Sequence, residues 1–104
     1  MSTLHSKLEI LQTEAFSEWL ESLRDREARS KILARITRAQ AGNLGSTKAL
    51  GGKVAEMKID YGPGYRVYFT RRGNTTILLL GGGDKRTQNA DIQAAKEMVK
   101  ELDD

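Results

Sequence analysis

Residues 55–69 read AEMKIDYGPGYRVYF, and this stretch decides the fold. Apolar and polar residues alternate on both sides of a central Tyr-Gly-Pro-Gly, with the period of two that is typical of a β-strand covered on one face. Glycine and proline between two such runs favour a tight turn. The stretch therefore predicts a β-hairpin whose apolar face carries Ala55, Met57, Ile59, Tyr65, Val67 and Phe69.

The polar face of this hairpin carries the first candidate site. If the register keeps the apolar residues together, Glu56 and Lys58 lie on the same face as Arg66 and Tyr68. An arginine inside a strand presents a rigid fork of donors that suits a pair of phosphate oxygens. An ion pair between Arg66 and Glu56 is the alternative, and spacing alone does not separate the two. Tyr68 is a candidate to stack on a base if it is exposed, although such tyrosines more often pack within the hairpin.

The segment after the hairpin supplies a central strand and a second candidate site. Residues 71–74 favour a turn, and residues 77–80 are apolar at every position, as expected of a strand covered on both faces. Glycines 81–83 are predicted to end this strand. Lys85 and Arg86 then lie at a helix start, where backbone N–H groups and the helix dipole attract anions. The plainer alternative is that the glycines only let the chain leave the sheet.

Helical periodicity flanks the sheet at both ends of the chain. After a strand-like run at residues 8–12, Thr13 and Asp25 are predicted to cap two helices that form a hairpin. Residues 42–52 contain four glycines and are predicted to be a loop. A last helix is expected from about Thr87. The apolar stripes are Phe16, Trp19, Leu20 and Leu23, then Ala28, Ile32, Ile36 and Ala39, and finally Ile92, Ala95, Val99 and Leu102.

This order of elements is strand, helix, helix, three antiparallel strands and helix, which belongs to the α+β class. We expect a single domain over residues 1–104, in which a small antiparallel β-sheet carries an N-terminal helical hairpin and a C-terminal helix. A chain of this length buries one core but no large enclosed cavity. The site is therefore expected to be an open groove.

Composition excludes several kinds of site. The chain has no cysteine and one histidine, so it has no cysteine nucleophile and no thiolate or histidine metal cluster. We expect no metal and no cofactor, and His5, so near the amino terminus, is not favoured as a base. No stretch approaches the roughly 18 apolar residues of a membrane helix, and no signal peptide is recognisable. A cytoplasmic protein without membrane contact is expected.

Positive charge is concentrated in residues 53–88. Seven lysines and arginines stand there against three acids, a balance of +4, whereas residues 89–104 hold two lysines against five acids. A polyanion would be attracted to the first segment and repelled by the second. Lys53, Arg71 and Arg72 are therefore candidates for binding nucleic acid, with a solvated basic surface as the alternative.

Two pieces of the sequence, GYRVYF at residues 64–69 and GGGDKRTQ at residues 81–88, resemble toxins of the RelE/HigB type. The first piece is common in the wider RelE/ParE superfamily, and the second is closer to the phage-related addiction-module killer proteins. The resemblance runs from about Glu9 to the end. It implies a RelE-like fold and a type II toxin–antitoxin toxin that inhibits translation by ribosome-dependent mRNA cleavage. It also implies a cognate helix-turn-helix antitoxin as a partner in a hetero-oligomer.

The resemblance further implies roles for individual residues. Arg66 would stabilise the scissile phosphate, and Lys58 and either Lys85 or Arg86 would line the site. The implied reaction is attack of a ribose 2′-OH on the adjacent phosphate, with the cations stabilising the transition state. Such an endoribonuclease would need no metal.

Two positions depart from the pattern of the family. Glu56 stands where RelE has a second lysine, and Ile92 stands where RelE has a tyrosine. The C-terminal histidines of HigB-type members have no counterpart. Glu56 or Tyr68 could replace the missing base, or electrostatics could carry most of the catalysis. A ParE-type inhibitor of DNA gyrase and a plain RNA-binding module therefore remain as alternatives.

Overall fold

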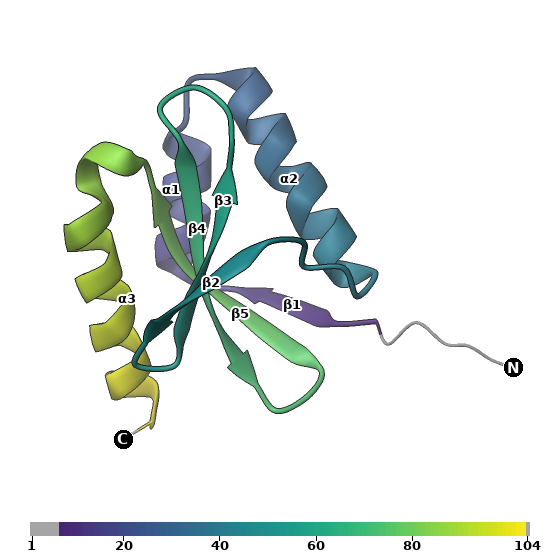
Figure 1. The fold of residues 1–104 in the computed structure, drawn as a ribbon, viewed down its shortest axis with the longest axis vertical. Coiled ribbons are helices and arrows are strands. Elements are labelled where there is room, and N and C mark those ends of the chain that lie inside the picture. Colours follow the sequence, from purple (N-terminus) through teal and green to yellow (C-terminus); the bar gives the residue numbers. More distant parts are fainter. Residues whose placement is uncertain (1–6, 104) are drawn as a thin grey trace, which may run out of the picture.

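The computed structural model describes residues 7–103, which form five strands and three α-helices (Figure 1). His5 lies outside the described residues. The strands are β1 (Glu9–Gln12), β2 (Thr47–Gly51), β3 (Val54–Ile59), β4 (Tyr65–Arg72) and β5 (Thr76–Gly83). The helices are α1 (Glu14–Ser22), α2 (Arg26–Gln40) and α3 (Gln88–Asp103), and a 3-10 turn at Lys85–Thr87 precedes α3. No helix within residues 7–103 has the length and apolar character to cross a membrane.

The strands form one sheet in the order β1-β5-β4-β3-β2. The pairs β2–β3, β3–β4 and β4–β5 are antiparallel, which confirms the predicted α+β class with a small, mostly antiparallel sheet. The pair β1–β5 is parallel, and this differs from the expected purely antiparallel sheet. Parallel neighbours need a long crossover between them. Here α1, α2 and the other strands provide that crossover.

The predicted loop at residues 42–52 is wrong in part, because it contains β2. Strand β2 pairs with β3 and forms the edge of the sheet. Gly51 and Gly52 have φ values of 85° and 60°, and they make the tight turn into β3. The glycines thus mark the end of a strand, whereas the sequence suggested that they belonged to a loop throughout.

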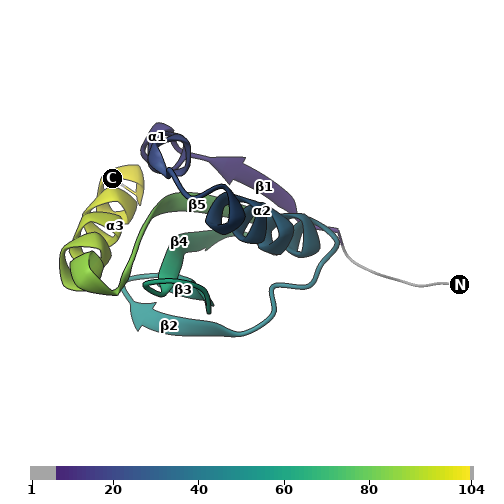
Figure 2. The ribbon, with the colours of Figure 1, turned by 90° about the horizontal axis from the view of Figure 1, so that it is seen from above.

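Each face of the sheet carries its own core. Helices α1 and α2 contribute to the first core, and α3 contributes to the second. Figure 2 shows α2 and α3 on opposite sides of the strands. The first core holds Phe16, Ile32, Ile36, Met57, Ile59, Val67, Phe69, Ile77 and Leu79; the second holds Val54, Tyr68, Leu80, Ala95 and Val99. The apolar alternation of the hairpin and the two-sided burial of β5 are therefore confirmed.

Both predicted helix caps are present. The Thr13 hydroxyl accepts a hydrogen bond from the Phe16 N–H at 3.1 Å and donates to the Leu79 carbonyl at 2.9 Å. Asp25 accepts from the first free N–H groups of α2. Each cap satisfies backbone donors that have no partner inside the helix. Thr13 also ties the start of α1 to the central strand.

Strand β5 extends through glycines 81–83 and ends at Gly83, so it runs three residues beyond the predicted apolar run at residues 77–80. Gly82 pairs with Val67 and Gly83 pairs with Arg66 on β4. A Cβ atom at Gly82 would clash with the Trp19 ring, and one at Gly83 would clash with the Asp91 carboxylate. The missing side chains let α1 and the start of α3 approach the strand closely.

Candidate functional site

A cleft of about 350 Å³ lies where the turn of the β3–β4 hairpin meets the start of α3. We call it the Arg66 cleft. It is an open groove, as the length of the chain suggested. Its lining residues are Lys58, Asp60, Tyr61, Gly62, Pro63, Gly64, Arg66 and Lys85.

The register of the hairpin brings the predicted polar residues to one face. Lys58 pairs with Arg66 and Glu56 pairs with Tyr68, so all four side chains lie on the face that α3 covers. This confirms the placement that follows from alternation. Their position on one face does not make all four side chains accessible, because α3 packs over part of this face.

Arg66 is held at the floor of the cleft and is 6% exposed. Its Nη1 donates to the Gly64 carbonyl at 2.7 Å, and its Nε lies 3.9 Å from Glu56 Oε1. Gly64 has a φ of 81°, a left-handed conformation that favours glycine. The turn therefore directs a carbonyl back to the guanidinium. Nε has no hydrogen-bond partner among the described residues.

Glu56 is also buried, and it is held by a residue that sequence reasoning did not single out. Gln88 Nε2 donates to Glu56 Oε1 at 3.4 Å from the first turn of α3. The same oxygen is the one nearest to Arg66 Nε. Gln88 belongs to the second family-like piece, but its contact depends on how α3 crosses β3, which no local pattern encodes.

Lys85 lies in the cleft, whereas Arg86 does not. The Arg86 side chain is 86% exposed, lies 3.8 Å from Asp84 and lines a separate hollow at the start of α3. Asp84 also accepts from the Arg86 N–H at 2.8 Å. Because the chain's own carboxylate occupies that N–H, the helix start is less available to an external anion than the sequence suggested.

Tyr68 corrects an expectation, because it is fully buried in the second core. Its ring therefore cannot stack on a base. Burial, followed by the negative charge of Glu56, raises the pKa of Tyr68 to about 12. The hydroxyl has no hydrogen-bond partner among residues 7–103.

Removal of this hydroxyl is expected to have little effect. In Tyr68→Phe, a buried polar group that lacks a partner disappears, so stability should stay unchanged or rise by about 1 kcal/mol. Urea unfolding monitored by circular dichroism would measure this change. A midpoint below that of the wild type would mean that the hydroxyl does have a stabilising partner.

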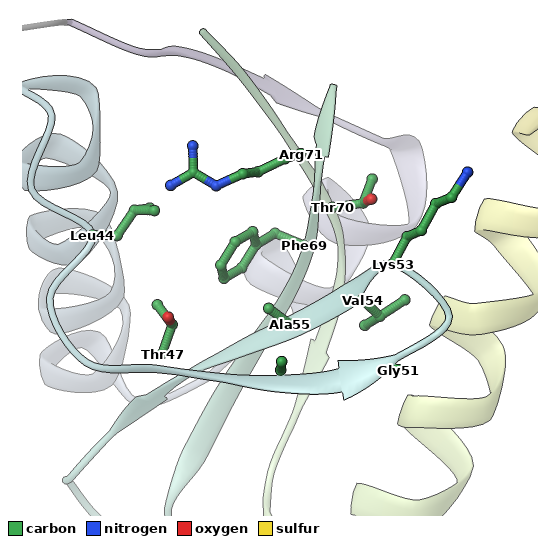
Figure 3. Close-up of a pocket in the computed structure, with 10 residues that line it drawn as sticks. Leu44, Thr47, Gly51, Lys53, Val54, Ala55, Phe69, Thr70 and Arg71 are labelled. Carbon is green, nitrogen blue, oxygen red and sulfur yellow. The ribbon is translucent and has the colours of Figure 1, made fainter. Parts of the chain in front are cut away.

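Lys53, Arg71 and Arg72 lie away from the Arg66 cleft. Arg71 is five residues beyond Arg66 on β4, which corresponds to about 16 Å along a strand. Arg72 and Lys53 lie 2.7 Å and 3.0 Å from Asp103, and their hydrogen bonds to its carboxylate lower the pKa of Asp103. Figure 3 shows Lys53 and Arg71 at a different hollow of about 420 Å³, under β2. They do not extend the Arg66 cleft.

Within residues 7–103, no three His, Cys, Asp or Glu side chains gather in a way that could hold a metal ion. The charged residues that line the Arg66 cleft are two lysines, one arginine and Asp60, which lies 3.5 Å from Lys58, and Glu56 lies behind the arginine. This set suits a phosphate group, because cationic donors surround one open space.

Comparison with known proteins gives the family. The family described as "Phage derived protein Gp49-like (DUF891)" matches residues 18–101, from α1 almost to the end of α3. The chain belongs to this family. The matched region includes Lys58, Arg66 and Lys85. The phage-related resemblance inferred from GGGDKRTQ is thereby confirmed.

Two further proteins are similar to this member of the Gp49-like family. A protein of Haemophilus influenzae, described only as uncharacterized, is 43% identical over 95 residues, which cover 91% of this chain and 96% of that protein. A mutant of the E. coli toxin RelE in the free state has a similar structure, with a TM-score of 0.69 at 13% identity. The match covers 88% of this chain and 97% of RelE. It confirms the RelE-like fold.

Proposed function

We propose that this protein is the toxin of a type II toxin–antitoxin system and inhibits translation by cleaving mRNA on the ribosome. The observation that carries the proposal is the convergence of Lys58, Arg66 and Lys85 on one open cleft. The phage-derived family and the fold shared with the E. coli toxin RelE support it. The proposal includes a cytoplasmic location, and a cognate helix-turn-helix antitoxin as partner in a hetero-oligomer.

The cations of the cleft suit the chemistry of phosphodiester cleavage. A ribose 2′-OH attacks the adjacent phosphorus, the O2′–P bond forms and the P–O5′ bond breaks. The leaving 5′-oxygen takes a proton from solvent, so the products are a 2′,3′-cyclic phosphate and a 5′-hydroxyl. Negative charge grows on the phosphate oxygens in the transition state, and the fork of Arg66 with the ammonium groups of Lys58 and Lys85 would stabilise it.

Glu56 is the proton acceptor that we assign to this reaction. Its Oε1 lies 3.9 Å from Arg66 Nε, behind the guanidinium that would contact the phosphate. A carboxylate next to this guanidinium can act as general base and take the proton of the 2′-OH. Tyr68 is disfavoured, because its pKa of about 12 keeps it protonated and it is buried. Ile92, at the position of the tyrosine in RelE, packs on the second core.

Toeprinting on translating ribosomes would test the proposal. Purified protein should shorten the reverse-transcription products at codons in the ribosomal A site, whereas ribosomes without the protein should give full-length products. Absence of cleavage by the wild-type protein would contradict the proposal. A DNA gyrase supercoiling assay should show no effect; inhibition there would favour the ParE-type alternative, and RNA binding without cleavage would favour a plain binding module.

A further inference from the structure

A second basic cleft of about 490 Å³ lies between α2 and the end of β3. We call it the α2 cleft. Four of its lining residues are cations, and Asp60 is the one acid among them. Its lining residues are Lys31, Ala34, Arg35, Arg38, Lys58, Ile59 and Asp60.

The cations of α2 follow one face of the helix. Lys31, Arg35 and Arg38 are spaced at i, i+4 and i+7, so they extend over about 10 Å along the axis. Lys31 lies 3.7 Å from Glu27, but both side chains are largely exposed, so this pair contributes little. Arg38 has no ion pair among residues 7–103. Lys31 and Arg38 are therefore available to a partner.

Arg35 has a structural role in the same cleft. Its guanidinium donates to the Lys58 carbonyl at 2.9 Å and to the Leu44 and Ser46 carbonyls at 3.2 Å and 3.3 Å. Partial burial, and then the charge of Arg38, lower the pKa of Arg35. Both guanidinium groups line the same cleft, where the charge of Asp60 raises the pKa of Arg35 and offsets part of this repulsion. A bound anion would relieve that repulsion.

The two clefts adjoin each other. Lys58 and Asp60 line both, and Lys31 lies over the ring of Tyr61, which lines the Arg66 cleft, at 5.3 Å from its centroid. Strand β2 pairs with β3 only as far as Met57, and beyond that point the Arg35 guanidinium, rather than a strand, contacts the Lys58 carbonyl. Figure 1 shows α2 beside this end of the hairpin and β2 lower on the sheet. A flexible chain can therefore cross this end of the hairpin from one cleft to the other.

We propose that the α2 cleft binds the sugar–phosphate backbone of RNA next to the segment held in the Arg66 cleft. The choice of RNA rests on the proposed function. An evenly cationic helix face that leads to a phosphate-binding cleft suits a polyanion that passes through both. The positive charge of the α2 cleft would also attract an acidic protein segment, but such a segment would not need to extend into the Arg66 cleft.

Fluorescence anisotropy with a labelled single-stranded RNA of about 12 nucleotides, within the range of known single-strand sites, would test this proposal. The double variant Lys31→Gln/Arg38→Gln should bind several-fold more weakly than the full-length wild-type chain. The slope of log K against log salt should become shallower by about 1.4, because each lost phosphate contact contributes about 0.7 on a single strand. Lys31→Gln alone should give about half of this change.

The matched control is Lys7→Gln/Lys100→Gln, which removes the same charge from exposed positions outside both clefts. Far-UV circular dichroism would verify that each variant is folded. Equal binding by the two double variants, or no RNA binding by the wild type, would overturn the inference. Weakened binding in Lys31→Gln/Arg38→Gln without any cleavage in toeprinting would support the α2 cleft while contradicting the proposed nuclease.

Discussion

Replacement of Arg66 by lysine is expected to lower the rate of the proposed ribosome-dependent mRNA cleavage by about 10²- to 10³-fold, the usual cost of losing one donor to a developing oxyanion. Lysine keeps the positive charge beside Glu56 but lacks the planar fork that can contact two phosphate oxygens at once. It also cannot reproduce the bond from Nη1 to the Gly64 carbonyl together with contact to the phosphate. Binding of mRNA should fall much less than the rate.

Lysine is preferable to alanine at this position because Arg66 and Glu56 are both buried. Removal of the charge would leave a buried carboxylate without its cation, and loss of activity would then not be distinguished from loss of stability. Single-turnover toeprinting would measure the rate, with Lys100→Gln as a control for loss of a surface cation. A rate within about threefold of wild type would exclude Arg66 from the role in transition-state stabilisation assigned here.

The second large effect concerns stability. Gly82→Ala is expected to lower the free energy of unfolding by about 1–3 kcal/mol or more, which is typical of overpacking. The added Cβ would meet the Trp19 ring, which is itself packed against the first core and against Tyr65. Either α1 or β5 must then move, and Thr13 links these two elements.

Gly81→Ala is the matched control, because a Cβ there would have no atom within 4 Å. Urea unfolding should show a lower midpoint for Gly82→Ala and a small change for Gly81→Ala. Equal midpoints for the two variants would mean that Trp19 yields without cost. The comparison separates the effect of the clash from the general effect of alanine on a glycine-rich strand.

The hairpin and its register could be predicted because alternation is a local property. Alternation directs Met57 and Val67 toward one core, and it places Lys58 and Arg66 together on the opposite face. The parallel pairing of β1 with β5 could not be predicted, because the periodicity of residues 8–12 does not name a partner strand. The glycine content of residues 42–52 suggested a loop, but β2 lies within this segment, and Gly51 and Gly52 form only the turn that follows it.

In the candidate site too, the residues placed by local alternation could be predicted, and those placed by distant elements could not. Arg66 and Lys58 follow from alternation, but the choice of Lys85 over Arg86 depends on the 3-10 turn after Asp84. Tyr68 was misplaced because α3, distant in sequence, covers it. The cations of α2 do not stand out in the sequence, because the apolar stripe is the feature that identifies this helix.

The position of β5 in the sheet has a consequence for synthesis of the chain. β5 is the last strand to be made, yet it lies between β1 and β4 and pairs Glu9 with Thr76. Contacts between residues so far apart in sequence form late. A nascent chain that ends before Thr76 lacks β5, which pairs with both β1 and β4, and it also lacks the Lys85 wall of the cleft. The site is therefore complete only after the ribosome has made the chain through Lys85.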